Sequence, residues 1–147
     1  MKQLLIFSLF ISLISCVKNQ ELTPTPAGSA IVNMTDPTKT FDVAGQKLLY
    51  QGSFMSNVHT TSGTAKVYDK DGKKTLVLEQ FVTDAGPDLR IYTSEDKSAT
   101  KFTELSTLSK TGNFYIEIPA TTDITKQKFI LIWCKQFSVL FGNSELK

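Results

Sequence analysis

The sequence has few of the residues that catalytic and metal sites use most often. It contains one histidine and two cysteines in 147 residues. One histidine leaves no convincing Ser-His-Asp triad, and a blue-copper centre would need two histidines beside a cysteine. Gly-x-Ser-x-Gly, Cys-x-x-Cys-His and the phosphate-binding glycine motifs are also absent. Hydrolysis, blue copper and covalent haem therefore find no support, and we expect no metal site.

The sequence also has little excess charge of either sign and few long apolar runs. The net charge is +2 and no basic stripe appears, which argues against nucleic acid as a partner. The apolar run at residues 4–14 follows a single positive charge at Lys2. It has about eleven residues, whereas a helix needs about twenty to cross a bilayer core. This layout is typical of a secretory signal peptide.

The apolar run ends at a cysteine. Its last residues, Leu13-Ile14-Ser15-Cys16, resemble the lipobox of bacterial lipoproteins, in which the cysteine takes a diacylglycerol on sulfur and becomes the new N-terminus. The resemblance implies that residues 1–15 are a cleaved lipoprotein signal peptide and that Cys16 carries the lipid. Two or three acyl chains give stable anchoring. We therefore expect a cell-envelope protein, lipid-anchored to a membrane and facing the periplasm or cell exterior. The alternative is an ordinary signal peptide followed by a coincidental cysteine.

The rest of the chain is long enough for one domain. Hydrophobic residues make up 41% of the sequence, as in ordinary globular proteins. Residues 16–40 are expected to be the lipidated cysteine and a flexible tether, because residues 22–29 contain two prolines and a glycine and no core-forming cluster. Residues 41–147 are expected to form the folded domain.

The domain region is made of short segments rich in β-branched and aromatic residues, with turn signals between them. Asp69-Lys70-Asp71-Gly72 predicts a hairpin turn and lacks the glycine and glutamate offsets of a calcium loop. Phe129–Cys134 is apolar on both faces, which predicts a central, covered strand. Only residues 100–108 have the spacing of a short helix. We predict an all-β fold, an antiparallel β-sandwich or a partly closed barrel.

Several short blocks follow one another in a specific order: Gly52-Ser53-Phe54, His59, Ser62-Gly63-Thr64-Ala65, Leu76-Val77-Leu78-Glu79-Gln80-Phe81, Gly86-Pro87-Asp88-Leu89, Ile132-Trp133-Cys134 and Phe137-Ser138-Val139-Leu140-Phe141-Gly142. Together, from about residue 48 to residue 146, they resemble the electron-transfer DM-thirteen domain family. The resemblance implies a β-fold in an extracellular or cell-surface protein, with one cysteine near the C-terminal end that is proposed to be redox-active. That cysteine corresponds to Cys134. The family's domain often stands beside haem-binding or redox domains, whereas this chain carries it alone.

Cys134 is accordingly the candidate redox thiol. A thiol reacts as the thiolate and needs some exposure. Lys135 and Trp133 are its neighbours, but in a strand their side chains point to the opposite face. The alternative is a small, inert core residue. Redox chemistry would use Cys134 alone, a bound cofactor, or a mixed disulfide with a redox or envelope protein whose identity the sequence does not give.

His59 is a weak candidate for a cofactor ligand. A non-covalent haem could use it with Met34 or Met55 as the second axial ligand. The alternative is a surface or hydrogen-bonding histidine in the loop before Thr60.

The remaining matched positions have structural explanations. Gly86-Pro87-Asp88 is expected to form a turn in which Asp88 bonds to nearby backbone amides. Gly63 belongs to a matched block. Trp133 and Phe137 are expected in the apolar core, and an electron relay through Trp133 is the functional alternative.

Two function classes follow from the sequence. The first is a membrane-tethered redox or electron-transfer module that uses Cys134. The second is a non-catalytic binding or scaffold module of the envelope or cell surface, which would present residues 57–62 and Gly86-Pro87 as recognition loops on a rigid sandwich.

Overall fold

The computed structural model describes residues 18–26 and 28–147, so the predicted signal peptide and Cys16 lie outside the described residues. The described chain forms ten strands and no helix, so the predicted all-β class is confirmed. The strands are β1 Thr23–Pro24, β2 Val32–Asn33, β3 Lys47–Ser56, β4 Thr61–Lys70, β5 Lys73–Thr83, β6 Leu89–Ser94, β7 Phe102–Thr107, β8 Lys110–Glu117, β9 Phe129–Cys134 and β10 Val139–Glu145. Within these ranges, no helix is long and apolar enough to cross a membrane.

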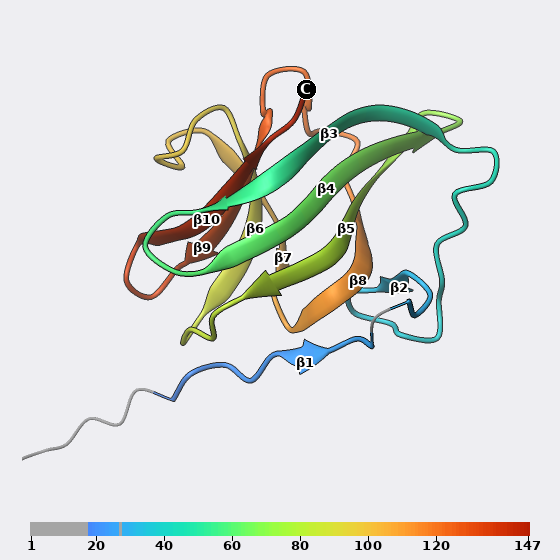
Figure 1. Ribbon diagram of the computed structural model, residues 1–147. Coiled ribbons are helices and arrows are strands. Elements are labelled where there is room, and N and C mark those ends of the chain that lie inside the picture. The colour runs from blue at the N-terminus through green and yellow to red at the C-terminus, as the bar shows by residue number, and fades with distance from the viewer. Residues whose placement is uncertain (1–17, 27) are drawn as a thin grey trace, which may run out of the picture.

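The strands form one curled, mostly antiparallel sheet in the order β1-β8-β5-β4-β3-β10-β9-β6-β7, with β2 also paired to β8. β3 joins the two halves of the sheet, because residues 47–53 pair with β4 and residues 54–56 pair with β10. Figure 1 shows the half with β10, β9 and β6 turning behind the half with β3, β4 and β5. The fold is therefore the partly closed barrel of the predicted all-β architecture.

One apolar core lies between the two halves. The half built from β4, β5 and β8 contributes Ala65, Val67, Leu76, Leu78, Phe81, Phe114 and Ile116. The half built from β6, β9 and β10 contributes Leu89, Ile91, Ile130, Ile132, Cys134 and Phe141. Because burial of apolar surface is the main driving force for folding, each half depends on the other.

Strand β9 is covered on both faces, as predicted. Ile130, Ile132 and Cys134 belong to the main core. Leu131, with Phe129 and Trp133 beside it, belongs to a second, smaller cluster on the outer side of the sheet. This alternation is the period-two pattern of a strand, and it places Cys134 inside the barrel and Trp133 outside.

The predicted hairpin turn is confirmed between β4 and β5. Lys70 pairs with Lys73, and the two residues between them, Asp71 and Gly72, have φ angles of 54° and 81°. Two successive positive φ angles define the turn type that matches the twist of a hairpin, and Asp-Gly is one of its preferred sequences.

A bulge in β5 explains Gly63. Between the pairs Ser62–Val82 and Thr64–Glu79, β4 has one residue and β5 has two. Gly63 has a φ of +113°, and a Cβ there would lie 2.8 Å from the carbonyl oxygen of Glu79 and 2.8 Å from Cα of Phe81. The absence of a side chain lets the bulged strand approach, and Phe81 is fully buried beside it.

The interpretation of residues 100–108 as a short helix was wrong, because this segment contains β7, which pairs with β6. A bulge caused the error. Ile91 pairs with Ser106 but Tyr92 pairs with Glu104, so Leu105 is an extra residue. Phe102 stacks on Tyr92 outside the sheet, while Leu105 packs against the core. A bulge shifts the alternation by one residue, which turned the period of a strand into the three-residue spacing of a helix.

The segment expected to be a flexible tether is attached to the domain at several of its described residues, the first of which is Gln20. β1 and β2 both pair in parallel with β8, and Met34 is 2% exposed in the main core. Gly112, with a φ of +91°, leaves room for Thr25, whose hydroxyl accepts a hydrogen bond from the amide of Asn113. The prolines and polar residues that suggested a solvated spacer therefore sit in an extended edge segment with specific attachments.

Replacing Gly63 and Gly72 separately by alanine tests the role of the β5 bulge. Gly72 also has a positive φ, but a Cβ there meets nothing within 4 Å, so Gly72→Ala is expected to cost about 1 kcal/mol of unfolding free energy. Gly63→Ala adds a clash with backbone and is expected to cost about 3 kcal/mol or more. Urea denaturation measures both values. Equal losses would show that close approach of β5 does not matter.

Candidate functional site

The predicted site residues gather at one end of the barrel. Three turns meet there: residues 57–60 between β3 and β4, residues 84–88 between β5 and β6, and residues 135–138 between β9 and β10. We call this the His59 end. The opposite end carries the β4–β5 hairpin and the loop from residue 95 to residue 101. Figure 1 shows the turns of the His59 end on the left and at the bottom of the molecule.

Cys134 is the last residue of β9 and lies just inside the His59 end. It is 0% exposed and belongs to the main core. Its strand partners are Leu89 of β6 and Val139 of β10. The amide of the next residue, Lys135, donates a hydrogen bond of 2.8 Å to the carbonyl oxygen of Asp88. In this conformation the thiol is shielded from solvent, as expected if Cys134 is a core residue. Its reactivity stays untested.

His59 covers an aromatic residue of the core. Its ring stacks on Phe141 with 3.9 Å between centroids and 32° between planes, and Phe141 is 3% exposed. Nδ1 of His59 lies 3.5 Å from Oδ2 of Asp84. The same carboxylate oxygen accepts a bond of 3.0 Å from the amide of Thr60, and the amide of Asp84 donates to the carbonyl of Thr60. The two predicted loops are therefore tied together.

Gly86 packs on the same aromatic ring. A Cβ at Gly86 would lie 2.8 Å from Cζ of Phe141 and 2.8 Å from Cδ2 of Leu89. Only a residue without a side chain lets segment 84–88 approach this closely. Phe141 is thus covered by His59 and approached by Gly86.

Asp88 differs from the expected backbone-bonded turn residue. Its carboxylate accepts a bond of 2.6 Å from Nε of Arg90, whose Nη1 donates to Glu104 at 2.7 Å. The bond to Asp88 is the main reason that the pKa of Arg90 is raised. Glu104 also bonds to Lys135 at 3.1 Å. This chain of charges joins β6, β7 and the β9–β10 turn on the outer face.

Sequence reasoning missed Gln20. Its amide hydrogen bonds to the carbonyl of Gly86 at 2.7 Å. Its side-chain nitrogen donates to the carbonyl of Leu108 at 2.7 Å, and its side-chain oxygen accepts from the amide of Leu89 at 3.3 Å. Gln20 therefore fastens the N-terminal segment to the residues next to Cys134. We call these three bonds the Gln20 latch. No local sequence pattern signals such bonds.

Phe137 does not lie in the apolar core, so that expectation was wrong, and Trp133 packs against the smaller outer cluster instead of the main core. Trp133 is half-buried in the outer cluster, 6.4 Å from the ring of Tyr92, which stacks on Phe102 at 4.3 Å. Burial is the largest cause of the raised pKa of Tyr92. Phe137 is 55% exposed, because it lies in the turn beyond the end of β9 rather than on a strand face. The outer aromatic row and Cys134 thus lie on opposite sides of β9.

The proposed haem ligands are not presented together. Met34 is buried, its sulfur accepts a bond from the hydroxyl of Ser109 at 3.4 Å, and the cavity of about 300 Å³ that it lines contains neither His59 nor Met55. His59 is engaged with Phe141 and Asp84, and Met55 is 53% exposed. Across residues 18–26 and 28–147, no group of three or more His, Cys, Asp or Glu residues is arranged to hold a metal ion.

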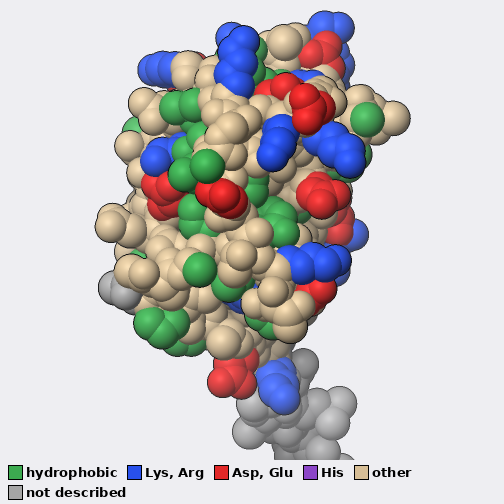
Figure 2. Space-filling model, turned by 90° about the vertical axis from the view of Figure 1, so that its right-hand side faces the viewer, with side chains coloured by type: hydrophobic (Ala, Val, Ile, Leu, Met, Phe, Trp, Pro, Cys, Tyr) green, Lys and Arg blue, Asp and Glu red, His purple; other side chains and the backbone are tan. Residues whose placement is uncertain are grey.

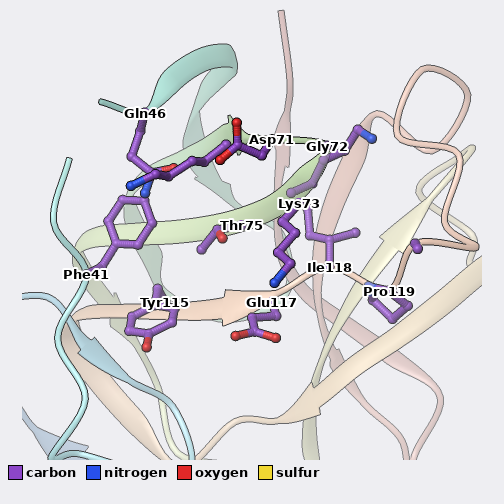
Figure 3. Close-up of a pocket in the computed structure, with 13 residues that line it drawn as sticks. Phe41, Gln46, Asp71, Gly72, Lys73, Thr75, Tyr115, Glu117, Ile118 and Pro119 are labelled. Carbon is purple, nitrogen blue, oxygen red and sulfur yellow. The ribbon is translucent and has the colours of Figure 1, made fainter. Parts of the chain in front are cut away.

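A larger open cavity, of about 800 Å³, lies at the opposite end of the barrel. Figure 3 shows the rings of Phe41 and Tyr115 side by side on one wall, with Lys73 extending toward Glu117. The two rings are 5.5 Å apart. The lining includes the predicted hairpin turn but none of the candidate site residues, and the redox candidate lies at the other end.

Comparison with known proteins gives one match. A model of the family described as Electron transfer DM13 matches residues 53–146. The match begins within β3 and contains β4 to β10, with His59, Gly63, Gly86 and Cys134, but not β1 or β2. No curated protein and no solved structure matches the chain.

Two substitutions test whether His59 stabilises the end of the barrel by stacking. His59→Ala exposes Phe141 and is expected to lower the unfolding free energy by about 1 kcal/mol. His59→Phe keeps a ring on Phe141 and is expected to stay within about 0.5 kcal/mol of the unchanged chain. Denaturant titration of both variants measures this. A loss in the phenylalanine variant as large as in the alanine variant would assign the stability to the contact with Asp84 instead.

Proposed function

The chain belongs to the Electron transfer DM13 family, and on that premise we propose that it is a redox module anchored to the outside of a membrane through lipid on Cys16. The observation that carries the redox part is the family match, which covers most of the core and the lone thiol of the described chain, Cys134. The anchoring part rests on the lipobox-like sequence before Cys16.

Cys134 is the proposed redox group of this module. It acts by thiol-disulfide exchange with a partner protein that carries a disulfide. The Cys134 thiolate attacks one partner sulfur, the partner's S–S bond breaks, and a mixed disulfide forms. The second partner sulfur leaves as a thiolate, and the proton of Cys134 passes to solvent.

Burial dictates how this reaction proceeds. A fully buried thiol cannot meet another protein, so exchange requires local opening of the His59 end. Segment 84–88 is the element to move, since it precedes Leu89, the strand partner of Cys134, and is held by the Gln20 latch and by Lys135. Loops open at a lower free energy than the whole domain. The latch therefore sets the rate of access.

Thiol labelling of the chain from Val17 to Lys147 tests this mechanism. In native buffer a disulfide reagent is expected to modify Cys134 slowly, but faster than global unfolding, because only the end has to open. Gln20→Ala removes the two side-chain bonds of the latch and is expected to raise the rate about tenfold, if their loss costs about 1.4 kcal/mol, whereas Gln51→Ala, at an exposed position of β3, leaves it unchanged. Mass spectrometry of the mixed disulfide gives the rates.

The control is Cys134→Ala, which must give no adduct. A labelling rate equal to the global unfolding rate in every variant would exclude thiol exchange in the folded protein, and family membership would stand without this mechanism. Optical spectra of the same protein before and after reduction check for another redox centre, which a reducible visible band would reveal.

Replacing Cys16 tests the anchor. The full chain expressed in a bacterium is expected to fractionate with membranes and to carry a lipid mass on Cys16. Cys16→Ser is expected to shift most of the protein to the soluble periplasmic or extracellular fraction. Without an acyl chain, only the apolar run at residues 4–14 could hold the protein to a bilayer, and this run is too short to cross it. Membrane retention of the serine variant at the original level would refute lipid anchoring at this residue.

A binding or scaffold module is the second candidate. The observation that favours it is the tie between the two predicted recognition loops through Asp84, His59 and Thr60, since loops held on a rigid scaffold suit recognition. Cys134→Ser separates the two candidates: a variant that folds and keeps full biological function favours binding, and one that folds and loses it favours the thiol.

A further inference from the structure

We propose that the His59 end of the barrel rests on the membrane surface, with Val58 and Phe137 inserted into the lipid interface. This orientation rests on the proposed lipidation of Cys16. Its partner is the bilayer that holds the anchor, and the three turns of the His59 end form the membrane-contact surface.

The length of chain between the lipid and the latch is the first argument. Four residue steps separate Cys16 from Gln20, which corresponds to at most about 14 Å of fully extended chain. Gln20 is bonded to Gly86, Leu89 and Leu108 at the His59 end. A lipid embedded in the bilayer therefore holds this end within a short distance of the headgroups.

The placement of exposed apolar side chains is a second, independent argument. Among the described residues, seven large apolar side chains are exposed; the four most exposed, Met55, Val58, Val82 and Phe137, at 53%, 64%, 52% and 55%, lie at or near the His59 end, whereas Val43, Leu48 and Phe102 lie elsewhere. Val58 and Phe137 are in two of the turns of the His59 end, and Met55 and Val82 are the next-to-last residues of β3 and β5, which run into it. Apolar side chains gathered at one surface mark contact with a protein or a membrane. Because the proposed lipid anchor also holds the His59 end close to the bilayer, we assign these side chains to membrane contact.

The opposite end has the exposed apolar side chains of Leu48 and Phe102, but its hairpin is highly charged. Lys70, Asp71, Lys73 and Lys74 lie there, on the β4–β5 hairpin. Figure 2, viewed from the right-hand side of Figure 1, shows Lys, Arg, Asp and Glu side chains scattered over that face. The ten residues of β4 span roughly 33 Å at about 3.3 Å per residue. While the Gln20 latch is closed, the hairpin therefore faces away from the bilayer.

Depth-dependent quenching tests this orientation. The full, lipidated chain is reconstituted in vesicles of phosphatidylethanolamine and phosphatidylglycerol that contain a lipid with a quencher near the headgroup. An environment-sensitive dye is attached in turn to Val58→Cys, Phe137→Cys and, as the matched control on the far hairpin, Asp71→Cys. The unsubstituted chain measures any dye on the buried Cys134. We expect at least a twofold loss of fluorescence at positions 58 and 137 and none at position 71.

A further variant tests the role of the Gln20 side chain in this orientation. Gln20→Ala in the Val58→Cys chain is expected to reduce quenching, because loss of the two side-chain bonds to Leu108 and Leu89 weakens the attachment of the N-terminal segment to the His59 end, while Gln51→Ala leaves quenching unchanged. Equal quenching with and without the Gln20 side chain would overturn the part of the proposal that rests on the latch.

The outcomes separate the orientation from the anchoring. Intact mass of the membrane-extracted chain reports lipid on Cys16. A lipidated chain whose dyes at positions 58 and 137 are quenched no more than the dye at position 71 would overturn the membrane-contact surface alone and would leave the three turns free for a protein partner. A chain without lipid on Cys16 would overturn both the anchoring and the orientation.

Discussion

Contact between the inward faces of the two half-sheets is the interaction on which the rest of the structure depends. The described chain has no helix to cover either face, and its cysteine forms no disulfide. Apolar burial must therefore hold the fold together. Strand β9 contributes Ile130, Ile132 and Cys134 to that contact. The position of the thiol is thus a consequence of packing: it is the last inward residue before the chain turns.

This packing role constrains any chemistry of Cys134. A residue that fills the core must leave its place, or its cover must move, before it can react with a partner. The cover consists of segment 84–88, whose Gly86 approaches Phe141, and the N-terminal segment that Gln20 fastens to it. Under the proposed thiol mechanism, a single set of bonds therefore controls both the stability of this end and access to the thiol. A partner or a surface that disturbs the N-terminal segment would then also regulate the reactivity of Cys134.

The parts of the fold that could be predicted were those with a local cause. The alternation in Phe129–Cys134 and the Asp71-Gly72 turn each depend on a few consecutive residues, and both were found as expected. β7 was missed because Leu105 is an extra residue in a bulge, which no local pattern reveals. The candidate site was identified as separate loops, but the joining of His59 to Asp84 and the bonds of Gln20 depend on chain segments far apart in sequence.

Under the proposed export and lipidation, the bonds of Gln20 also determine the order of events. The partner of its side-chain nitrogen, Leu108, lies 88 residues later in the chain, and contacts of such long sequence separation form late in folding. An exported chain therefore exposes Cys16 well before residue 108 has crossed the membrane. Enzymes that attach lipid would meet an unfolded N-terminal segment with free access, and the same segment would then be drawn against the finished barrel. Because the bonds of Gln20 form late, lipid would be attached to Cys16 before the orientation of the barrel at the membrane becomes fixed.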